Sequence, residues 1–221
     1  MRKTSAAIAA FALTLAFAGA ASAANVTVHN TGLDAAGNAL AAGDGQTDGN
    51  YTIVSSTLSG VNAGPAATYY NSAYVADNAG SRWISYSGSP FVGVGYATFQ
   101  TTFDLTGFNA ATAQLSGLWG VDNEGDILLN GVSIASLTGT VFSSFDSLHA
   151  FSAASGFLSG VNTLTFEVHD TGAPMAFRTD SLVVTADVAG VPEPAAWALM
   201  LSGFALIGAT LRRRPAVAVA A

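Results

Sequence analysis

Short stretches in which apolar and polar residues alternate dominate the chain between residues 24 and 189, and long amphipathic helical patterns are missing. In residues 163–169, 98–105 and 113–121 every second side chain is apolar or small. A repeat of two places alternate side chains on opposite faces of a strand, one buried and one in water. The pattern predicts an all-β domain.

Further strands are expected at 26–28, 51–57, 69–75, 82–86 and 181–187. Asn130-Gly131 separates two apolar runs and predicts a hairpin, because a type I′ turn needs positive φ at both central residues. About eight short strands in roughly 165 residues favour a two-sheet sandwich or jelly roll as one domain over 24–189. A chain of this size can form its own core without metals or disulfides.

The distribution of charge excludes several classes of partner. Arg2 and Lys3 open the chain and three arginines close it, whereas the stretch from 24 to 190 holds only Arg82 and Arg178 against thirteen acidic residues, a formal charge of −11. Such a domain repels phosphate backbones and anionic lipid, so we expect no binding of nucleic acid. The chain has no cysteine, which excludes disulfides, a thiol nucleophile, a cysteine zinc site and a lipid-modified cysteine.

Residues 1–23 have the three parts of a secretory signal peptide. A basic start precedes an apolar run from about residue 6 to 18, and Ala21-Ser22-Ala23 supplies the small residues at which signal peptidase cleaves. The alternative is an uncleaved membrane anchor, but the apolar run is short for a span. The sequence therefore predicts export through the inner membrane.

A second signal lies at the C-terminus. Val-Pro-Glu-Pro at 191–194 is followed by seventeen uncharged residues, 195–211, and then by the basic residues 212–214, with a tail at 215–221. Seventeen helical residues span about 26 Å, enough for a thin bilayer. Trp197 stands where an interfacial aromatic is expected, and the arginines favour the cytoplasmic side. The pattern predicts a transmembrane helix with the domain outside.

This tripartite ending, placed at 190–214, resembles the PEP-CTERM sorting signal of exported Gram-negative bacterial proteins, a motif also known as the ice-binding protein C-terminal domain. The resemblance implies recognition and processing by an exosortase in the inner membrane, and then release to the cell surface or extracellular matrix. It implies that Pro192, Glu193 and Pro194, with Arg212, Arg213 and Arg214, are read by another enzyme. An ordinary tail anchor with a proline-containing stalk is the alternative.

The central region resembles a galactose-binding-like β-sandwich between about Tyr96 and Val184. The resemblance rests on a phenylalanine-led segment at 103–108, a tryptophan-bearing strand ending in Asp-Asn at 113–123, and Leu-Asn-Gly at 129–131; the strand at 162–168 fits next. The resemblance implies the fold and leaves the ligand open, because this scaffold hosts many functions.

One acidic segment is a candidate metal site. Asp122, Asn123, Glu124 and Asp126 offer the hard oxygen ligands that calcium prefers, although their spacing does not match an EF-hand. Asp, Asn and Gly are also the residues that a tight turn requires, so the segment is either a calcium site or a turn. The acidic loop at 44–48 is a second, weaker candidate.

Five aromatic residues fall within eighteen positions: Tyr69, Tyr70, Tyr74, Trp83 and Tyr86. Tyrosine and tryptophan combine a flat apolar face with a polar edge, which suits stacking on sugar rings. The alternative is that alternate rings fill the core. The segment is therefore a candidate glycan-binding site.

The sequence gives little support for catalysis. The three histidines show no metal-binding spacing, no Gly-x-Ser-x-Gly elbow is present, and Glu124 and Glu167 each fit a turn or a solvated strand face. We expect a non-enzymatic, exopolysaccharide-associated surface or matrix protein that can bind carbohydrate. The alternative is a secreted carbohydrate-active enzyme or its accessory module.

Overall fold

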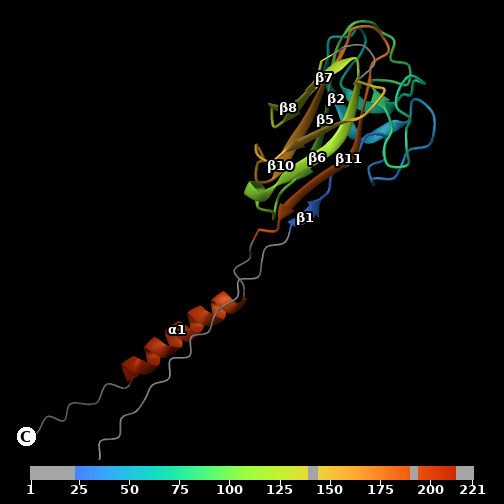
Figure 1. Cartoon of the computed structure of the whole chain (residues 1–221). Helices are drawn as coiled ribbons and strands as arrows, with labels where there is room; N and C mark the ends of the chain where they lie inside the picture. Colours follow the sequence, from blue (N-terminus) through green and yellow to red (C-terminus); the bar gives the residue numbers. More distant parts are fainter. Residues whose placement is uncertain (1–22, 139–143, 190–193, 213–221) are drawn as a thin grey trace, which may run out of the picture. The chain divides into compact units, whose positions relative to one another are not determined.

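The computed structural model of the chain describes residues 23–138, 144–189 and 194–212. The chain divides into two units, Ser22–Ala189 and Met1–Ala21 with Gly190–Ala221. In the described part, the first unit consists of β-strands and one short 3-10 helix, η1 (Ala110–Thr112), and the second contains the helix α1 (Pro194–Arg212) (Figure 1). The all-β prediction for the central domain is confirmed.

The strands of the described residues all pair antiparallel. Their bounds are β1 (Ala23–Val26), β2 (Thr47–Ser56), β3 (Gly64–Thr68), β4 (Ile84–Ser85), β5 (Gly95–Asp104), β6 (Gln114–Asp122), β7 (Glu124–Leu129), β8 (Val132–Leu137), β9 (His149–Ala153), β10 (Val161–Asp170) and β11 (Ala176–Asp187).

The hydrogen-bonded order is β8-β7-β10-β5-β2-β3-β4-β11-β6-β9, and β1 pairs with β11. The sheet curls through β3 and β4, so that the layer with β5 and β10 faces the layer with β6 and β11 (Figure 1). This arrangement is the predicted β-sandwich, and it buries one face of each layer against the other.

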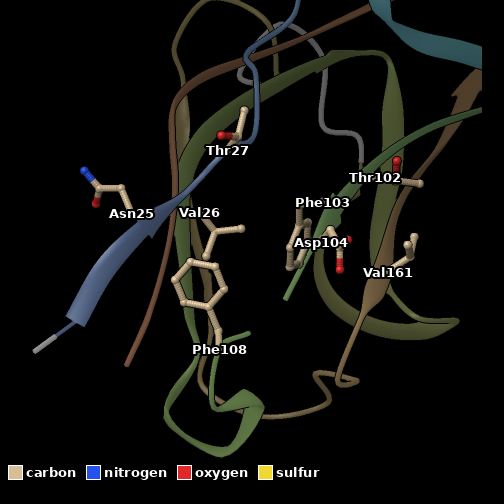
Figure 2. Close-up of a pocket in the computed structure, with 8 residues that line it drawn as sticks. All are labelled: Asn25, Val26, Thr27, Thr102, Phe103, Asp104, Phe108 and Val161. Carbon is tan, nitrogen blue, oxygen red and sulfur yellow. The ribbon is translucent and has the colours of Figure 1, made fainter. Parts of the chain in front are cut away.

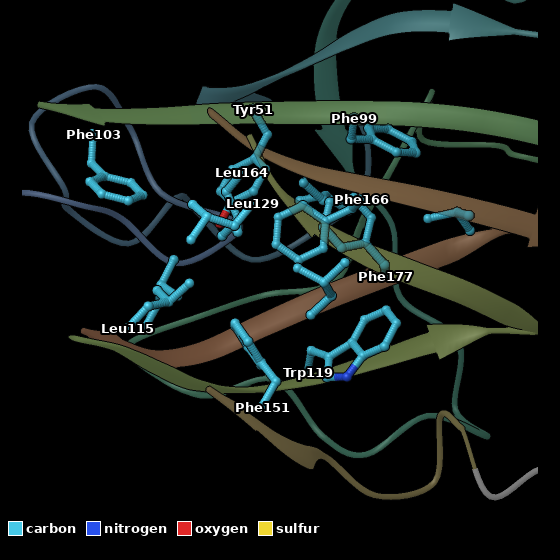
Figure 3. Close-up of a cluster of buried hydrophobic side chains, with 14 of the residues drawn as sticks. Tyr51, Phe99, Phe103, Leu115, Trp119, Leu129, Phe151, Leu164, Phe166 and Phe177 are labelled. Carbon is cyan, nitrogen blue, oxygen red and sulfur yellow. The ribbon is translucent and has the colours of Figure 1, made fainter. Parts of the chain in front are cut away.

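Aromatic side chains from both layers meet in the core (Figure 3). Phe166 of β10 stacks on Phe177 of β11 with ring centroids 4.9 Å apart, and Tyr51 contacts both rings at 5.8 Å. Trp119 of β6 lies at the same level, 6.5 Å from Phe166. The chain has no cysteine and therefore no disulfide between the layers. Burial of these large apolar rings is the main force that holds the two layers together.

The strands predicted from alternation agree well with the structure. In β10 the side chains of Leu164, Phe166 and Val168 are buried while Glu167 is exposed. The predicted hairpin joins β7 to β8, and its turn residues Asn130 and Gly131 have φ values of 52° and 82°. These values are those that the Asn-Gly signal requires.

Several local predictions were wrong. Residues 69–75 form a turn, because the amides of Ala73 and Tyr74 donate to the side-chain and backbone oxygens of Asn71. The strand expected at 82–86 is only two residues long, and the one expected at 26–28 ends at Val26. The sequence of β3 holds glycine, proline and alanine, which are depleted in strands, so this strand was missed, as was β9.

The helix α1 covers the segment expected to be helical after the Pro-Glu-Pro motif. Proline suits the first turn of a helix, and the final Arg212 interacts favourably with the helix dipole. Its side chains from Leu199 to Ile207 include several exposed apolar residues. Within the described residues, no helix combines the length and the apolar character that a membrane span needs. The predicted transmembrane span over 195–211 is therefore not confirmed.

Candidate functional site

Three of the five aromatic residues predicted to stack on sugars are buried, so the prediction was wrong for them. Tyr69, Tyr74 and Trp83 pack with Phe145 in a small second cluster. Tyr74 lies 4.5 Å from Trp83 and 5.4 Å from Phe145 between ring centroids. The rings of Tyr74 and Trp83 are therefore closed to a ligand, whereas Tyr69 keeps only a small exposed surface in the wall of one pocket.

The polar edges of these buried rings are satisfied internally. Nε1 of Trp83 donates to the carbonyl oxygen of Val75 at 2.8 Å, and the Tyr74 hydroxyl donates to Oδ2 of Asp122 at 2.7 Å. Burial is the main cause that raises the pKa of the Asp122 carboxyl from 3.8 to about 6; the hydrogen bond from Tyr74 opposes the rise, and the nearby Asp170 adds to it. Asp122 is thus part of the packing beneath the aromatic cluster.

Tyr70 behaves differently, because 40% of its surface is exposed on the rim of a pocket. The pocket has a volume of about 320 Å³ and is called the Tyr70 pocket here. It is lined by Ala42, Gly43, Asp44, Thr68, Tyr69, Tyr70, Asp77 and Arg82. The loop before β2, the last residue of β3 and the loop between β3 and β4 supply these residues.

Short hydrogen bonds fix the rim of the Tyr70 pocket. The backbone amide of Tyr70 donates to Oδ1 of Asp44 at 2.9 Å. The Thr68 hydroxyl donates to the carbonyl oxygen of Gly43 at 2.8 Å, and the carbonyl oxygen of Thr68 accepts from the Gly45 amide at 2.7 Å. The acidic loop predicted as a second calcium candidate therefore holds the Tyr70 segment in place.

The Tyr70 pocket also contains one of the two arginines of the domain. Nη1 of Arg82 lies 3.5 Å from Oδ2 of Asp77, and Nε of Arg82 donates to the carbonyl oxygen of Leu40 at 2.9 Å. Burial raises the pKa of Asp77, although a hydrogen bond from the amide of Trp83 and the charge of the nearby Arg178 both lower it. The pair remains partly exposed and can form further hydrogen bonds.

The guanidinium of Arg178, only 1% exposed, supports the loop that carries Asp77. It donates to the carbonyl oxygen of Ala76 at 2.6 Å, to Oγ of Ser81 at 2.8 Å and to Oδ2 of Asp180 at 2.9 Å. Ala76 and Ser81 lie on either side of Asp77 in the chain. The Arg178 side chain therefore fixes the position of the Asp77–Arg82 pair in the Tyr70 pocket.

An aromatic rim with a carboxylate and a guanidinium in a shallow pocket is suited to a hydroxyl-rich ligand. The ring can cover the apolar face of a sugar, and the charged groups can accept from and donate to neighbouring hydroxyls. The sequence analysis identified Tyr70 but missed Asp77 and Arg82. The available signal was their place within the aromatic segment, between Tyr74 and Trp83.

Of the four residues predicted to bind calcium, Asp122 and Asn123 are in contact, and there the Asn123 amide donates to the Asp122 carboxylate at 2.6 Å. Asp122 also accepts from Tyr74, Oε2 of Glu124 lies 3.3 Å from Nδ1 of His169, and Asp126 is the cross-strand neighbour of Glu167 in the β7–β10 ladder. In the weaker candidate loop, the Asp48 carboxylate accepts from backbone amides. Among the described residues no group of three His, Asp or Glu side chains could hold a metal ion.

A second pocket, of about 370 Å³, lies beside β1 (Figure 2). Val26, Phe103 and Phe108 point toward one another from different elements, whereas the Asn25 side chain points away. Its one carboxylate, Asp104, accepts hydrogen bonds from the amide and hydroxyl of Thr106 at 2.8 and 2.7 Å. Polar and apolar atoms contribute almost equally to the surface of this pocket, and its carboxylate is already engaged by Thr106.

The two processing signals lie largely outside the described residues. The predicted residues outside the described part are Ala21 of the signal cleavage site, Pro192 and Glu193 of the sorting motif, and Arg213 and Arg214 of the basic cluster. Ala23 is the first residue of β1 and pairs with Asp187. Pro194 begins α1 and Arg212 ends it.

Comparison with known proteins supports the C-terminal assignment. The family model of the PEP-CTERM protein-sorting motif matches residues 190–214. The chain thus carries the sorting motif that its sequence resembles. No curated protein sequence matches the chain.

Among solved structures, the chain is similar to a Stig cyclase from Fischerella sp. TAU in complex with (3Z)-3-(1-methyl-2-pyrrolidinylidene)-3H-indole. The identity is 12%, the TM-score is 0.45, and the match covers 76% of this chain and 100% of that one. It is also similar to a CBM35 from Paenibacillus barcinonensis, with 15% identity, a TM-score of 0.34 and coverage of 66% and 100%. At these scores the similarities carry no weight for function.

Proposed function

We propose that this chain is an exported surface protein whose β-sandwich binds a carbohydrate of the extracellular matrix at the Tyr70 pocket. The observation that carries the proposal is the half-exposed ring of Tyr70 beside the Asp77–Arg82 pair. An exposed aromatic ring and paired polar groups in one shallow pocket provide both contacts that a sugar needs. A neutral exopolysaccharide is the proposed ligand.

The sorting motif at 190–214 supports the cellular part of the proposal. The motif implies export, a C-terminal membrane anchor and processing by an exosortase. In this proposal the signal peptide is removed after Ala23, the segment 195–211 tethers the chain to the inner membrane, and cleavage near Pro192–Pro194 releases the domain to the cell surface or matrix. Replacing Pro192, Glu193 and Pro194 by alanine should leave a full-length membrane-bound form, visible as a slower band on a gel.

Binding by the Tyr70 pocket can be tested with the full-length protein purified in detergent. We expect it to bind neutral glycans on an array, and Tyr70→Ala to weaken that binding about tenfold because the stacking ring is lost. Tyr70→Phe is the matched control, since it keeps the ring, and should bind within about twofold of the wild type. Equal binding by Tyr70→Ala and wild type would contradict the proposal.

The same samples test the alternative of a carbohydrate-active enzyme. The Tyr70 pocket contains two carboxylates, but Asp44 accepts from the Tyr70 amide and Asp77 is paired with Arg82. Groups engaged in this way are poorly placed for acid–base catalysis. We therefore expect bound polysaccharide to be recovered intact, and the release of new reducing ends would favour the enzymatic alternative.

A further inference from the structure

The outer face of the sheet formed by β2, β5, β10 and β7 carries an exposed tyrosine that the fold holds rigidly. The ring of Tyr96 stacks on His169 with centroids 4.1 Å apart and planes within 5°. Its backbone amide donates to Oγ1 of Thr57 at 2.8 Å, and its carbonyl oxygen accepts from Oγ of Ser56 at 3.0 Å. Even so, 52% of Tyr96 is exposed. A ring fixed in advance loses little conformational entropy when it binds a ligand.

Polar groups surround this ring in a pocket of about 280 Å³. Hydroxyl-bearing side chains of β2, of the residue after it and of β5 line the pocket together with the carboxylate of Glu167: Ser55, Ser56, Thr57, Tyr96, Thr98 and Glu167. The cross-strand pairs Ser55–Thr98 and Thr98–Glu167 place these groups in one row across three strands. The row offers hydrogen bonds beside the tyrosine, as a sugar chain requires.

The charges on this face are all acidic apart from His169. Asp126 and Glu167 are direct cross-strand neighbours, and Glu124 is the neighbour of His169 in the same ladder. Within the described residues, neither the Asp126 nor the Glu167 carboxylate takes part in a hydrogen bond or an ion pair. Like charges directly opposite one another destabilise a sheet. The face therefore carries a repulsion that a bound cation-bearing ligand would relieve.

From these observations we infer that the Tyr96 face is a second binding site, and that its ligand is a polysaccharide with free amino groups. Protonated amino groups would pair with Asp126 and Glu167, while the sugar ring covers Tyr96. Acidic polysaccharides are excluded by the same charges. This inference goes beyond the proposed function, because the site shares no residue with the Tyr70 pocket.

The test compares two probes of equal length, fully deacetylated and fully N-acetylated glucosamine oligomers, with the full-length protein in detergent. We expect the deacetylated oligomer to bind at least about tenfold more tightly at low salt, and the difference to shrink as salt is raised. No preference for the deacetylated oligomer would overturn the inference.

Substitutions of the acidic residues on the Tyr96 face show whether the deacetylated oligomer binds there. Asp126→Asn with Glu167→Gln should weaken binding of the deacetylated oligomer about threefold to tenfold, and should raise the thermal midpoint of the free protein by about 1–2 °C because the repulsion is removed. The control Asp146→Asn with Asp187→Asn removes the same charge from the β8–β9 segment and from β11, and should change neither value. If both double variants bind equally, the attraction is a property of the whole anionic domain and the inference is wrong.

The two sites can be distinguished from one another. Tyr96→Ala should reduce binding of the deacetylated oligomer and leave binding of neutral glycans at the Tyr70 pocket unchanged; Tyr70→Ala should do the opposite. If Tyr70→Ala binds neutral glycans as the wild type does, while Tyr96→Ala weakens binding of the deacetylated oligomer, the proposed function is refuted and this inference stands. If Tyr96→Ala binds the deacetylated oligomer as the wild type does, the Tyr96 face is not the site.

Discussion

The buried guanidinium of Arg178 allows a quantitative test of how the fold positions the Tyr70 pocket. Arg178→Met keeps the apolar stem but removes three hydrogen bonds, to Ala76, Ser81 and Asp180. Removal of one partner from a buried ion pair costs about 3–5 kcal/mol, because the other groups stay buried without it. For a domain of this size, a loss of 4 kcal/mol lowers the melting temperature by about 10 °C.

Urea unfolding of the full-length protein, followed by near-ultraviolet circular dichroism, measures this loss. The control is Arg82→Met, because Arg82 is partly exposed and lies 3.5 Å from its partner Asp77, and it should cost only about 1 kcal/mol. Arg178→Met should also weaken glycan binding, since it releases the loop that carries Asp77. If Arg178→Met costs no more than Arg82→Met, the proposed support of this loop is wrong.

Two further changes test the packing and the electrostatics. Gly49→Ala should cost about 1–3 kcal/mol of unfolding free energy, because the new Cβ would overlap the backbone nitrogen of Ala35, whereas Gly64→Ala meets open space and should be neutral by the same urea assay. Burial raises the pKa of Asp122 to about 6 in the folded state, from 3.8, so the folded state binds its proton more tightly than the unfolded state. The stabilisation that comes from the protonated Asp122 carboxyl is fully present below about pH 4, and it is lost as the pH rises through 6. Asp122→Asn should therefore lose less stability than the wild type between pH 4 and 6, and an identical pH profile would contradict the assignment.

The sequence predicts those strands well whose side chains alternate between the core and water. In β5 and at the residue directly after it, Phe99, Phe103 and Leu105 alternate with polar residues, and all three are buried in the structure. The same alternation places Tyr96 and Thr98 on the solvated face, so the second binding face could have been predicted from this pattern. The Asn130-Gly131 hairpin was predictable because its backbone conformation depends on two adjacent residues.

The Tyr70 pocket could not be predicted in the same way. Its residues come from two loops and the end of β3, and long-range contacts bring them together, such as the bond between the amide of Tyr70 and Asp44. The aromatic run from 69 to 86 was ambiguous, since spacing alone does not show which rings are buried. Packing against Phe145, sixty or more residues later, decides that Trp83 and Tyr74 are part of the core.

Intact-mass measurement of the protein recovered from outside the cell tests the central claim most directly. If the chain is exported, processed at both ends and released as a carbohydrate-binding sandwich, the recovered product begins at Ala24 and ends near the Pro192–Pro194 motif. Recovery of the uncut 221-residue chain in the cytosol, with no shorter product outside the cell, would contradict the account.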